Sequence, residues 1–161
     1  ADFKIHSEEI YTSKKWPTDP LFYMSAPSVT DDTIAPDGHE NLFILIPIAP
    51  DLEDTEAIRE HYFSRVVERI KMITGEDLQD RIVYKRSYCV KDFKADYHSF
   101  QGNAYGLANT LRQTAFMKPK MKSRKLDNLY FTGQLTVPGP GIPPALISGQ
   151  IVAREVMKNY A

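Results

Sequence analysis

Hydrophobic residues recur at helical spacing most clearly over residues 54–75. Asp54 or Thr55 can cap the start of this stretch, because a side-chain oxygen there accepts a hydrogen bond from a free amide, and Gly75 can end it. The apolar side chains stand three or four positions apart, which places them on one face of a helix: Ile58, Tyr62, Val66, Ile70 and Ile73. The pattern therefore predicts one long amphipathic helix.

Two apolar stretches before this helix predict strands. Residues 21–26 (LFYMSA) are rich in aromatic and apolar side chains and are followed by Pro27. Residues 41–48 (NLFILIPI) are too uniformly apolar for a half-exposed strand, so we expect a central strand buried on both faces. The residues between them are turn formers that end in Asp37-Gly38, a strong turn dipeptide. We therefore expect an antiparallel pair joined by a long loop.

The remaining elements are shorter. We expect a short helix within residues 1–20, a strand at 81–88, a short helix at 90–100, a long connection at 101–127, a strand at 128–133 and a helix at 143–159. Together these elements predict an α+β fold in which an antiparallel or mixed sheet packs with helices.

A glycine-proline loop joins the last strand to the last helix. Three glycines and four prolines lie between Gly133 and Pro144 (GQLTVPGPGIPP), and the two final prolines suit the first helical positions, where no N–H is needed. One helix face then carries small side chains for close packing: Ala145, Gly149 and Ala153. The corner suits a ligand with negative charge or hydrogen-bond acceptors at the helix N-terminus. Equally, it can be a tight strand–helix corner that binds nothing, and it lacks the glycine and acidic pattern of a dinucleotide fingerprint.

Composition narrows the classes of function. The chain has 161 residues, of which 42% are hydrophobic and 25% charged, as in a soluble single domain. Its formal net charge of −1 argues against a general nucleic-acid-binding protein. Cys89 is the only cysteine, and the sequence shows neither a membrane span nor a signal peptide, so we expect a cytoplasmic protein. The scattered histidines predict no metal site, and we expect no cysteine nucleophile.

Three segments resemble the FAD-dependent phytoene desaturase (carotenoid desaturase) family. Residues 128–153 (NLYFTGQLTVPGPGIPPALISGQIVA) are similar to its C-terminal signature, a strand ending in Gly, a T-x-P-G-x-G-hydrophobic-P turn and a helix. Residues 19–50 are similar to its strand–turn–strand with S-A-P-S-x-T-D and A-P-x-G elements. Residues 100–119 are similar to the segment that carries G-x-A-[FY]-G. The match runs in order over residues 15–160, which makes it more specific than any single motif.

The resemblance implies that the chain is the C-terminal third of such an enzyme. Residues 1–125 would be part of the substrate-binding subdomain, with its antiparallel sheet. Residues 126–161 would be the last strand and helix of the Rossmann-like FAD-binding subdomain, which the family assembles from separate chain segments. The missing N-terminal part of the same enzyme would then be a partner of this segment, and we expect the segment alone to be inactive.

The resemblance also assigns cofactor and substrate contacts. It places Gly133 and Gln134 near the FAD phosphates and ribityl chain, although Gln134 stands where many relatives carry a small or acidic residue. It places Tyr105 and Leu107 against an apolar chain, and Val137, where some relatives carry His, suggests a different substrate environment. The backbone beneath and beside the flavin ring would come from Gly139, Gly141, Ile142, Pro143 and Ala145.

The activity implied by the resemblance is the removal of a hydride from an allylic C–H of a long apolar polyene by oxidised flavin. The cofactor carries that reaction, so we predict no catalytic side chain in this segment. A flavin-dependent isomerase or saturase is an alternative, and so is a non-catalytic α+β binding module. The basic run at residues 118–125 is typical of a solvated loop, and it could instead contact anionic lipid head groups when a lipid-dissolved polyene is the substrate.

Overall fold

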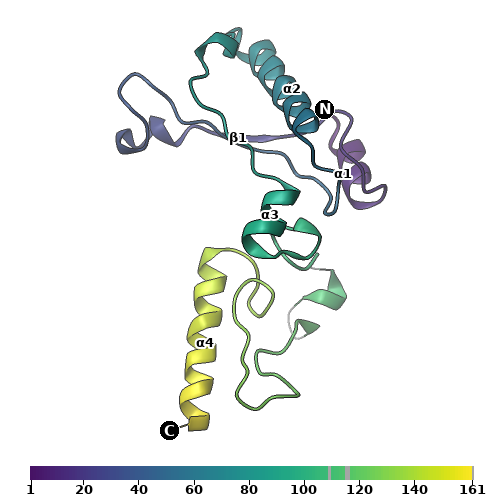
Figure 1. Cartoon of the computed structure of the whole chain (residues 1–161), viewed down its shortest axis with the longest axis vertical. Helices are drawn as coiled ribbons and strands as arrows, with labels where there is room; N and C mark the ends of the chain where they lie inside the picture. Colours follow the sequence, from purple (N-terminus) through teal and green to yellow (C-terminus); the bar gives the residue numbers. More distant parts are fainter. Residues whose placement is uncertain (109, 115–116, 161) are drawn as a thin grey trace. The chain divides into compact units, whose positions relative to one another are not determined.

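The computed structural model describes residues 1–108, 110–114 and 117–160, without the side chain of residue 160. These residues contain four α-helices, short 3-10 turns and one two-stranded antiparallel sheet (Figure 1). The predicted α+β class is confirmed. The chain divides into two compact units, Ala1–Gly102 and Asn103–Ala161. Residues 109 and 115–116 of the predicted connection lie outside the described residues.

The sheet of the first unit pairs β1 (Tyr23–Ser25) with β2 (Phe43–Leu45). The pairing is antiparallel, with Tyr23 opposite Leu45, so the predicted pair with its long loop is confirmed. The prediction of a central strand buried on both faces is wrong, because β2 is three residues long and Phe43 is 53% exposed. Within the described residues the sheet has two strands, so each strand is an edge and no third strand covers β2.

The predicted helices of this unit are confirmed. They are α1 (Phe3–Tyr11), α2 (Glu56–Thr74) and α3 (Val90–Tyr97). For α2, the Thr55 side chain caps the start by accepting a hydrogen bond from the Ile58 amide, and Gly75 ends it in the left-handed region at φ 79°. The sequence signals at both ends of α2 therefore act as predicted.

The apolar face of α2 forms the core of the first unit. Tyr62, Val66, Val67 and Ile70 are buried on this face. Tyr62 also stacks on Trp16 with ring centroids 4.7 Å apart, and its hydroxyl donates to the Pro17 carbonyl at 2.7 Å. The aromatic pair thus packs the segment that follows α1 against the long helix.

An ionic cluster joins the start of α2 to the start of α3. The Arg59 guanidinium donates from Nε and Nη2 to the two carboxylate oxygens of Asp54, each at 2.7 Å, and from Nη2 to Asp92 at 2.7 Å. Asp54 is 2% exposed and also accepts the Lys91 amide at 2.8 Å. The hydrogen bond from Arg59 is the main reason why the pKa of Asp54 lies below its usual range.

Two predicted strands are wrong. Residues 81–88 form no strand, and Val83 is 79% exposed. Residues 128–133 make a single antiparallel bridge, between Tyr130 and Lys122, in place of a strand. Both segments have strand-like composition, but within the described residues neither has a neighbouring strand to satisfy its backbone groups along its length.

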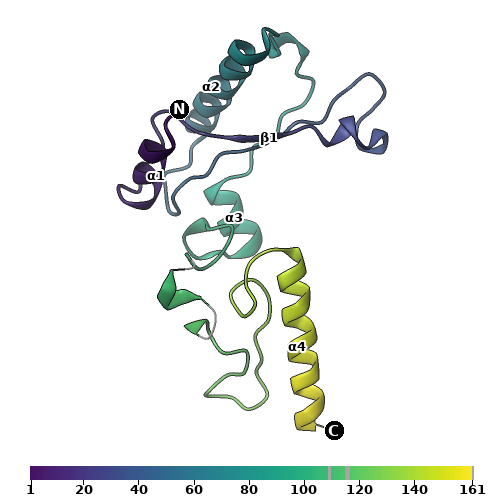
Figure 2. The same ribbon diagram turned by 180° about the vertical axis from the view of Figure 1, so that it is seen from behind.

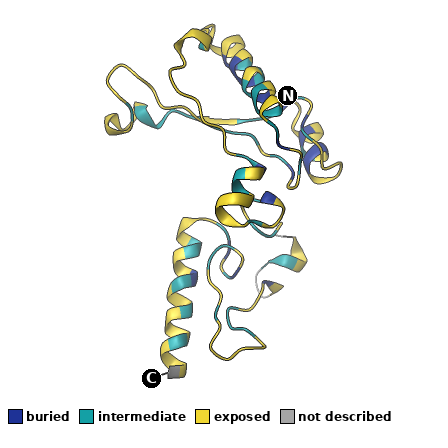
Figure 3. Cartoon of the chain, in the orientation of Figure 1, coloured by how far each residue is buried: buried dark blue, intermediate teal, exposed yellow. Residues whose placement is uncertain are grey.

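The predicted last helix is confirmed as α4 (Ile142–Tyr160). The loop at residues 118–133 runs beside α4 in both views of the second unit (Figures 1 and 2), and Asn159 Nδ2 donates to the Tyr130 hydroxyl at 3.1 Å. Figure 3 shows that exposed residues dominate α4. Among the helices of the described residues, none is long and apolar enough to cross a membrane.

Candidate functional site

The glycine-proline loop folds into a turn that precedes α4. Its three glycines all have positive φ: 101° at Gly133, 144° at Gly139 and 108° at Gly141. L-residues rarely adopt these conformations, so the backbone path itself requires glycine. Thr136 is buried inside the turn, where its amide and hydroxyl both donate to the Gly133 carbonyl, at 3.1 and 2.9 Å. The loop therefore satisfies its own polar groups and has a defined shape.

Ser148 fixes this loop to α4. Its Oγ accepts the Gly133 amide at 2.7 Å, shares a hydrogen bond with Thr132 Oγ1 at 2.7 Å and donates to the Ala145 carbonyl at 2.6 Å. The side chain is fully buried. Sequence reasoning missed Ser148 because it considered only the small side chains on the helix. The available signal was a lone hydroxyl next to Gly149 on an otherwise apolar stretch of α4.

The small-residue face of α4 packs less closely than a backbone-to-backbone contact. A Cβ built on Gly149 would lie 3.8 Å from Thr132 Oγ1, an ordinary van der Waals distance. Ala145 is half-buried and Ala153 is exposed. The space beside Gly149 would thus accept a methyl group, and the face remains open beyond it.

The corner that leads into the helix is open. A Cβ built on Gly133 would have no atom within 4 Å outside its chain neighbours, and one built on Gly141 would lie 3.5 Å from Pro144 Cδ. Ile142 is 79% exposed, and Pro143 is exposed as well. At Gly133 and Gly141 the side chains of this unit leave the backbone accessible, as a site that rests on main-chain atoms requires, whereas Gly139 is buried.

The residues predicted to contact a cofactor therefore lie on one loop and the first turn of one helix. Gln134 and Ala145 are half-buried, and Gly139 is buried. The assignment of these residues to a cofactor stays a prediction. What the structure gives it is a continuous stretch from Gly133 to Ala145 that contains accessible backbone and ends at the positive end of the α4 dipole. Pro143 and Pro144 have no N–H there, and the Ala145 amide donates to the Gly141 carbonyl at 3.0 Å.

A second glycine loop packs against the same segment. Gly106 has φ 80°, its amide donates to Asn103 Oδ1 at 2.6 Å, and a Cβ built on it would lie 2.4 Å from Leu135 Cδ2. The predicted substrate residues flank Gly106: Tyr105 is 62% exposed and Leu107 is half-buried. The structure thus brings the Tyr105–Leu107 segment next to the residue that follows Gln134. Their role toward a substrate stays a prediction.

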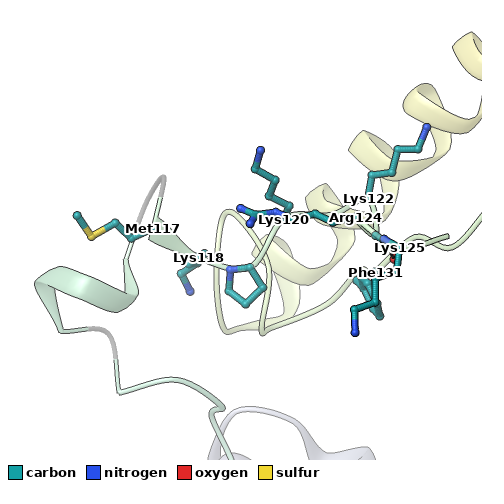
Figure 4. A pocket seen from close by; sticks show the side chains of 9 residues that line it. Met117, Lys118, Lys120, Lys122, Arg124, Lys125 and Phe131 are labelled. Atoms are coloured by element: carbon teal, nitrogen blue, oxygen red, sulfur yellow. Dashed lines mark hydrogen bonds between the residues drawn. The ribbon is translucent and has the colours of Figure 1, made fainter. Parts of the chain in front are cut away.

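Positive charge gathers on the second unit. Residues 103–161 carry eight Lys and Arg against two Asp and Glu, which gives a formal charge of +6, while residues 1–102 carry −7. The overall charge of −1 conceals this asymmetry. Much of the excess lines a hollow of about 630 Å³ (Figure 4). We call it the basic hollow; its lining comprises Met117, Lys118, Pro119, Lys120, Lys122, Ser123, Arg124, Lys125 and Phe131.

Lys118 differs from the other cations of the basic hollow because it is buried. It is 6% exposed, and a Cβ built on Gly139 would lie 3.1 Å from its Nζ. Within the part of the chain that the structure describes, Lys118 Nζ is the buried side-chain nitrogen or oxygen that has no hydrogen-bond partner. Sequence reasoning missed it, because Lys118 and Lys120 are indistinguishable in a run of basic residues.

Comparison with known proteins finds that the chain is similar to desaturases. It is 48% identical to a carotenoid 3,4-desaturase of Haloarcula japonica over 161 residues, which is 100% of this chain and 32% of that protein. It is 32% identical to the 4,4'-diapophytoene desaturase (4,4'-diaponeurosporene-forming) of Staphylococcus aureus strain Newman over 166 residues, covering 98% of this chain and 33% of that protein. No family model matches. The chain thus spans about a third of the length of these relatives.

Proposed function

We propose that this chain, whose resemblance to the carotenoid desaturases is confirmed along its full length, forms part of an FAD-dependent enzyme that desaturates a long apolar polyene. In this proposal residues 1–125 contribute to the substrate-binding subdomain, and residues 126–161 contribute to a Rossmann-like FAD-binding subdomain. The observation that carries it is the open, glycine-built corner between Gly133 and the start of α4.

The residues of the corner fit an FAD molecule. At Gly133 no side chain occupies the space above the backbone, and Ser148 holds the turn in place from behind. We assign the phosphates and ribityl chain to Gly133 and Gln134. We assign the flavin ring to the stretch from Gly139 to Pro143, at the N-terminus of α4, where the helix dipole favours negative charge. When bound, oxidised FAD supplies the acceptor for the hydride removed from an allylic C–H.

The chain's own residues supply placement and exclusion of water. Tyr105 and Leu107 present an aromatic ring and an aliphatic side chain on either side of Gly106, which packs against Leu135, and we assign them to contact with the polyene. Gly106 lets their backbone approach Leu135 closely. Apolar walls suit a substrate without polar groups, because the gain comes from apolar surface removed from water.

The test uses the full-length protein that contains this chain. We expect it to retain flavin on purification. We expect a phytoene-type polyene added without oxygen to bleach the oxidised flavin absorption and to yield a product that has lost two hydrogens. A product of unchanged mass would indicate an isomerase, one with added hydrogens would indicate a saturase, and a protein that never holds flavin would contradict the proposal.

A matched pair of glycine variants separates the site from backbone strain. Gly133 and Gly38 both have positive φ, 101° and 74°, and a Cβ built on either meets no atom within 4 Å. Each Gly→Ala change therefore strains a positive φ, at a cost of the order of 1–2 kcal/mol. Only Gly133→Ala adds a methyl group at the proposed phosphate contact. We expect it to weaken FAD binding at least tenfold, while Gly38→Ala leaves FAD binding unchanged.

We also propose that the basic hollow contacts anionic lipid head groups at the membrane that contains the polyene. The hollow presents four exposed or half-buried cations besides Lys118: Lys120, Lys122, Arg124 and Lys125. Each basic residue near an anionic surface adds about 1 kcal/mol of attraction. We expect the full-length protein to float with phosphatidylserine vesicles, and a variant with these four residues changed to Gln to stay unbound. Flotation that is equal for both proteins would refute the contact.

A further inference from the structure

The side chain of Lys118 points at the glycine-proline loop. Measured from a Cβ built on Gly139, Nζ lies at 3.1 Å and Cε at 3.8 Å, so the tip of the side chain is its closest atom. Both residues are buried and belong to the same compact unit. The ammonium therefore lies against the backbone at the middle of the loop, on the side where Gly139 has no side chain.

An ammonium in this position needs a negative partner. A buried charge is ordinarily paired, because its removal from water carries a large desolvation cost. Lys118 Nζ has neither a hydrogen-bond acceptor nor an acidic partner among the described residues. The second unit as a whole contains two acidic residues, Asp127 and Glu155, against eight basic ones. The structure thus holds an oriented, desolvated cation beside the corner, and the described residues supply no counter-charge there.

We infer that Lys118 binds the flavin ring of the bound cofactor and stabilises the negative charge that the ring gains on reduction. This inference rests on the proposed function. Accepting a hydride adds two electrons and one proton to the ring, so the ring gains one negative charge, and the hydride comes from the polyene. Lys118 is assigned to the ring because Gly139 lies in the half of the loop that faces the ring. The proposed phosphate contact, Gly133, lies six residues earlier.

A cation held at this point favours the reduced ring over the oxidised one, because only the reduced ring carries the additional charge. Its Coulomb attraction is strengthened by the low effective dielectric of a buried site. Lys118 would thereby make the flavin a stronger hydride acceptor. Such an effect needs no contact between Lys118 and the polyene.

The test measures the reduction potential of flavin in the full-length holoenzyme by equilibration with a reference dye. Lys118→Met keeps the length and packing of the side chain and removes its charge. We expect the variant to retain flavin and to disfavour reduction about tenfold, a shift of ~30 mV to lower potential for a two-electron couple. Lys118→Arg keeps the positive charge, so its reduction potential should lie close to that of the unaltered protein. Lys158→Met removes an exposed charge of the same unit, on α4, and should leave the potential unchanged.

Each other outcome overturns the inference. If Lys118→Met weakens FAD affinity tenfold or more at an unchanged potential, then the ammonium binds the phosphates and not the ring. If both affinity and potential are unchanged, Lys118 has no role toward the cofactor. Both results presuppose that the unaltered protein holds flavin, so they are distinct from a failure of the proposed function, in which the unaltered protein holds none.

Discussion

Ser148→Ala tests whether the hydroxyl that fixes the glycine-proline loop is needed for cofactor binding. The change removes one oxygen and leaves the Gly133 amide without the acceptor that now lies at 2.7 Å. An unsatisfied donor of this kind costs about 1–3 kcal/mol. Thr132 also loses its hydrogen-bond partner, but it is exposed, so its hydroxyl can bond water instead. The Ala145 carbonyl loses the Ser148 hydroxyl as a donor and stays within the first turns of α4. We therefore expect a loss of about 2 kcal/mol from the interactions that hold the turn.

The consequence for binding follows from that magnitude. Where the turn must be restored before FAD binds, 2 kcal/mol corresponds to a roughly thirtyfold weaker FAD affinity. The assay is titration of the full-length apoprotein with FAD, followed by flavin fluorescence, with thermal melting alongside. Ser123→Ala is the matched control, because Ser123 Oγ also accepts backbone amides, from Lys125 and Leu126, in a turn away from the corner. Equal FAD affinity in Ser148→Ala and the unaltered protein would refute the reasoning.

Three further predictions concern the first unit and the second glycine loop. Arg59→Met should destabilise the first unit by about 3 kcal/mol in urea denaturation, because it leaves the buried Asp54 with the Lys91 amide as its remaining partner; a loss below 1 kcal/mol would contradict this. Because the pKa of Asp54 is lower in the folded state, the carboxylate contributes stability that is present above its pKa in the unfolded state and is lost as the pH falls through its pKa in the folded state. The urea concentration at the unfolding midpoint should therefore decrease once the pH is below about 4. In Arg59→Met this drop should be smaller. Gly106→Val should lower polyene turnover and the melting temperature, since it strains a positive φ and collides with Leu135; Leu135→Ala in the same chain should recover part of the melting temperature.

The sequence predicted the elements whose signals are local. The oxygen of Thr55 and the glycine at residue 75 act within one turn of each end of α2, and the apolar stripe repeats along the helix itself, so these signals need no distant partner. The same holds for α4, where prolines stand in the first turn. The two strand predictions were wrong for the opposite reason. Residues 81–88 have strand composition, but a strand also needs a neighbour, and the described residues provide none there.

The site shows the same division. The loop glycines could be predicted because Gly139 and Gly141 alternate with prolines and Gly133 lies a few residues before them, and the positive φ values of all three agree with a loop that requires glycine. Ser148 and Lys118 could not, since their roles depend on distances across the fold. Ser148 reaches back 15 residues to Gly133, and Lys118 lies 21 positions before Gly139. No periodicity or motif in a single sequence encodes such contacts.

The open corner and the exposed face of α4 share Ile142. Ile142, Leu146 and Met157 remain 79%, 67% and 61% exposed, an unusual state for large apolar side chains on one helix. Burial of such a side chain yields about 1.5–3 kcal/mol, so covering all three would contribute as much as the net stability of a small domain. In proteins of the relatives' length, the other two-thirds of the chain is available to cover them. Because Ile142 opens α4 and also lies in the predicted ring contact, packing on this face and closure of the flavin site would involve the same turn of helix. A change at Leu146 should then weaken flavin binding although it leaves every residue of the glycine-proline loop in place.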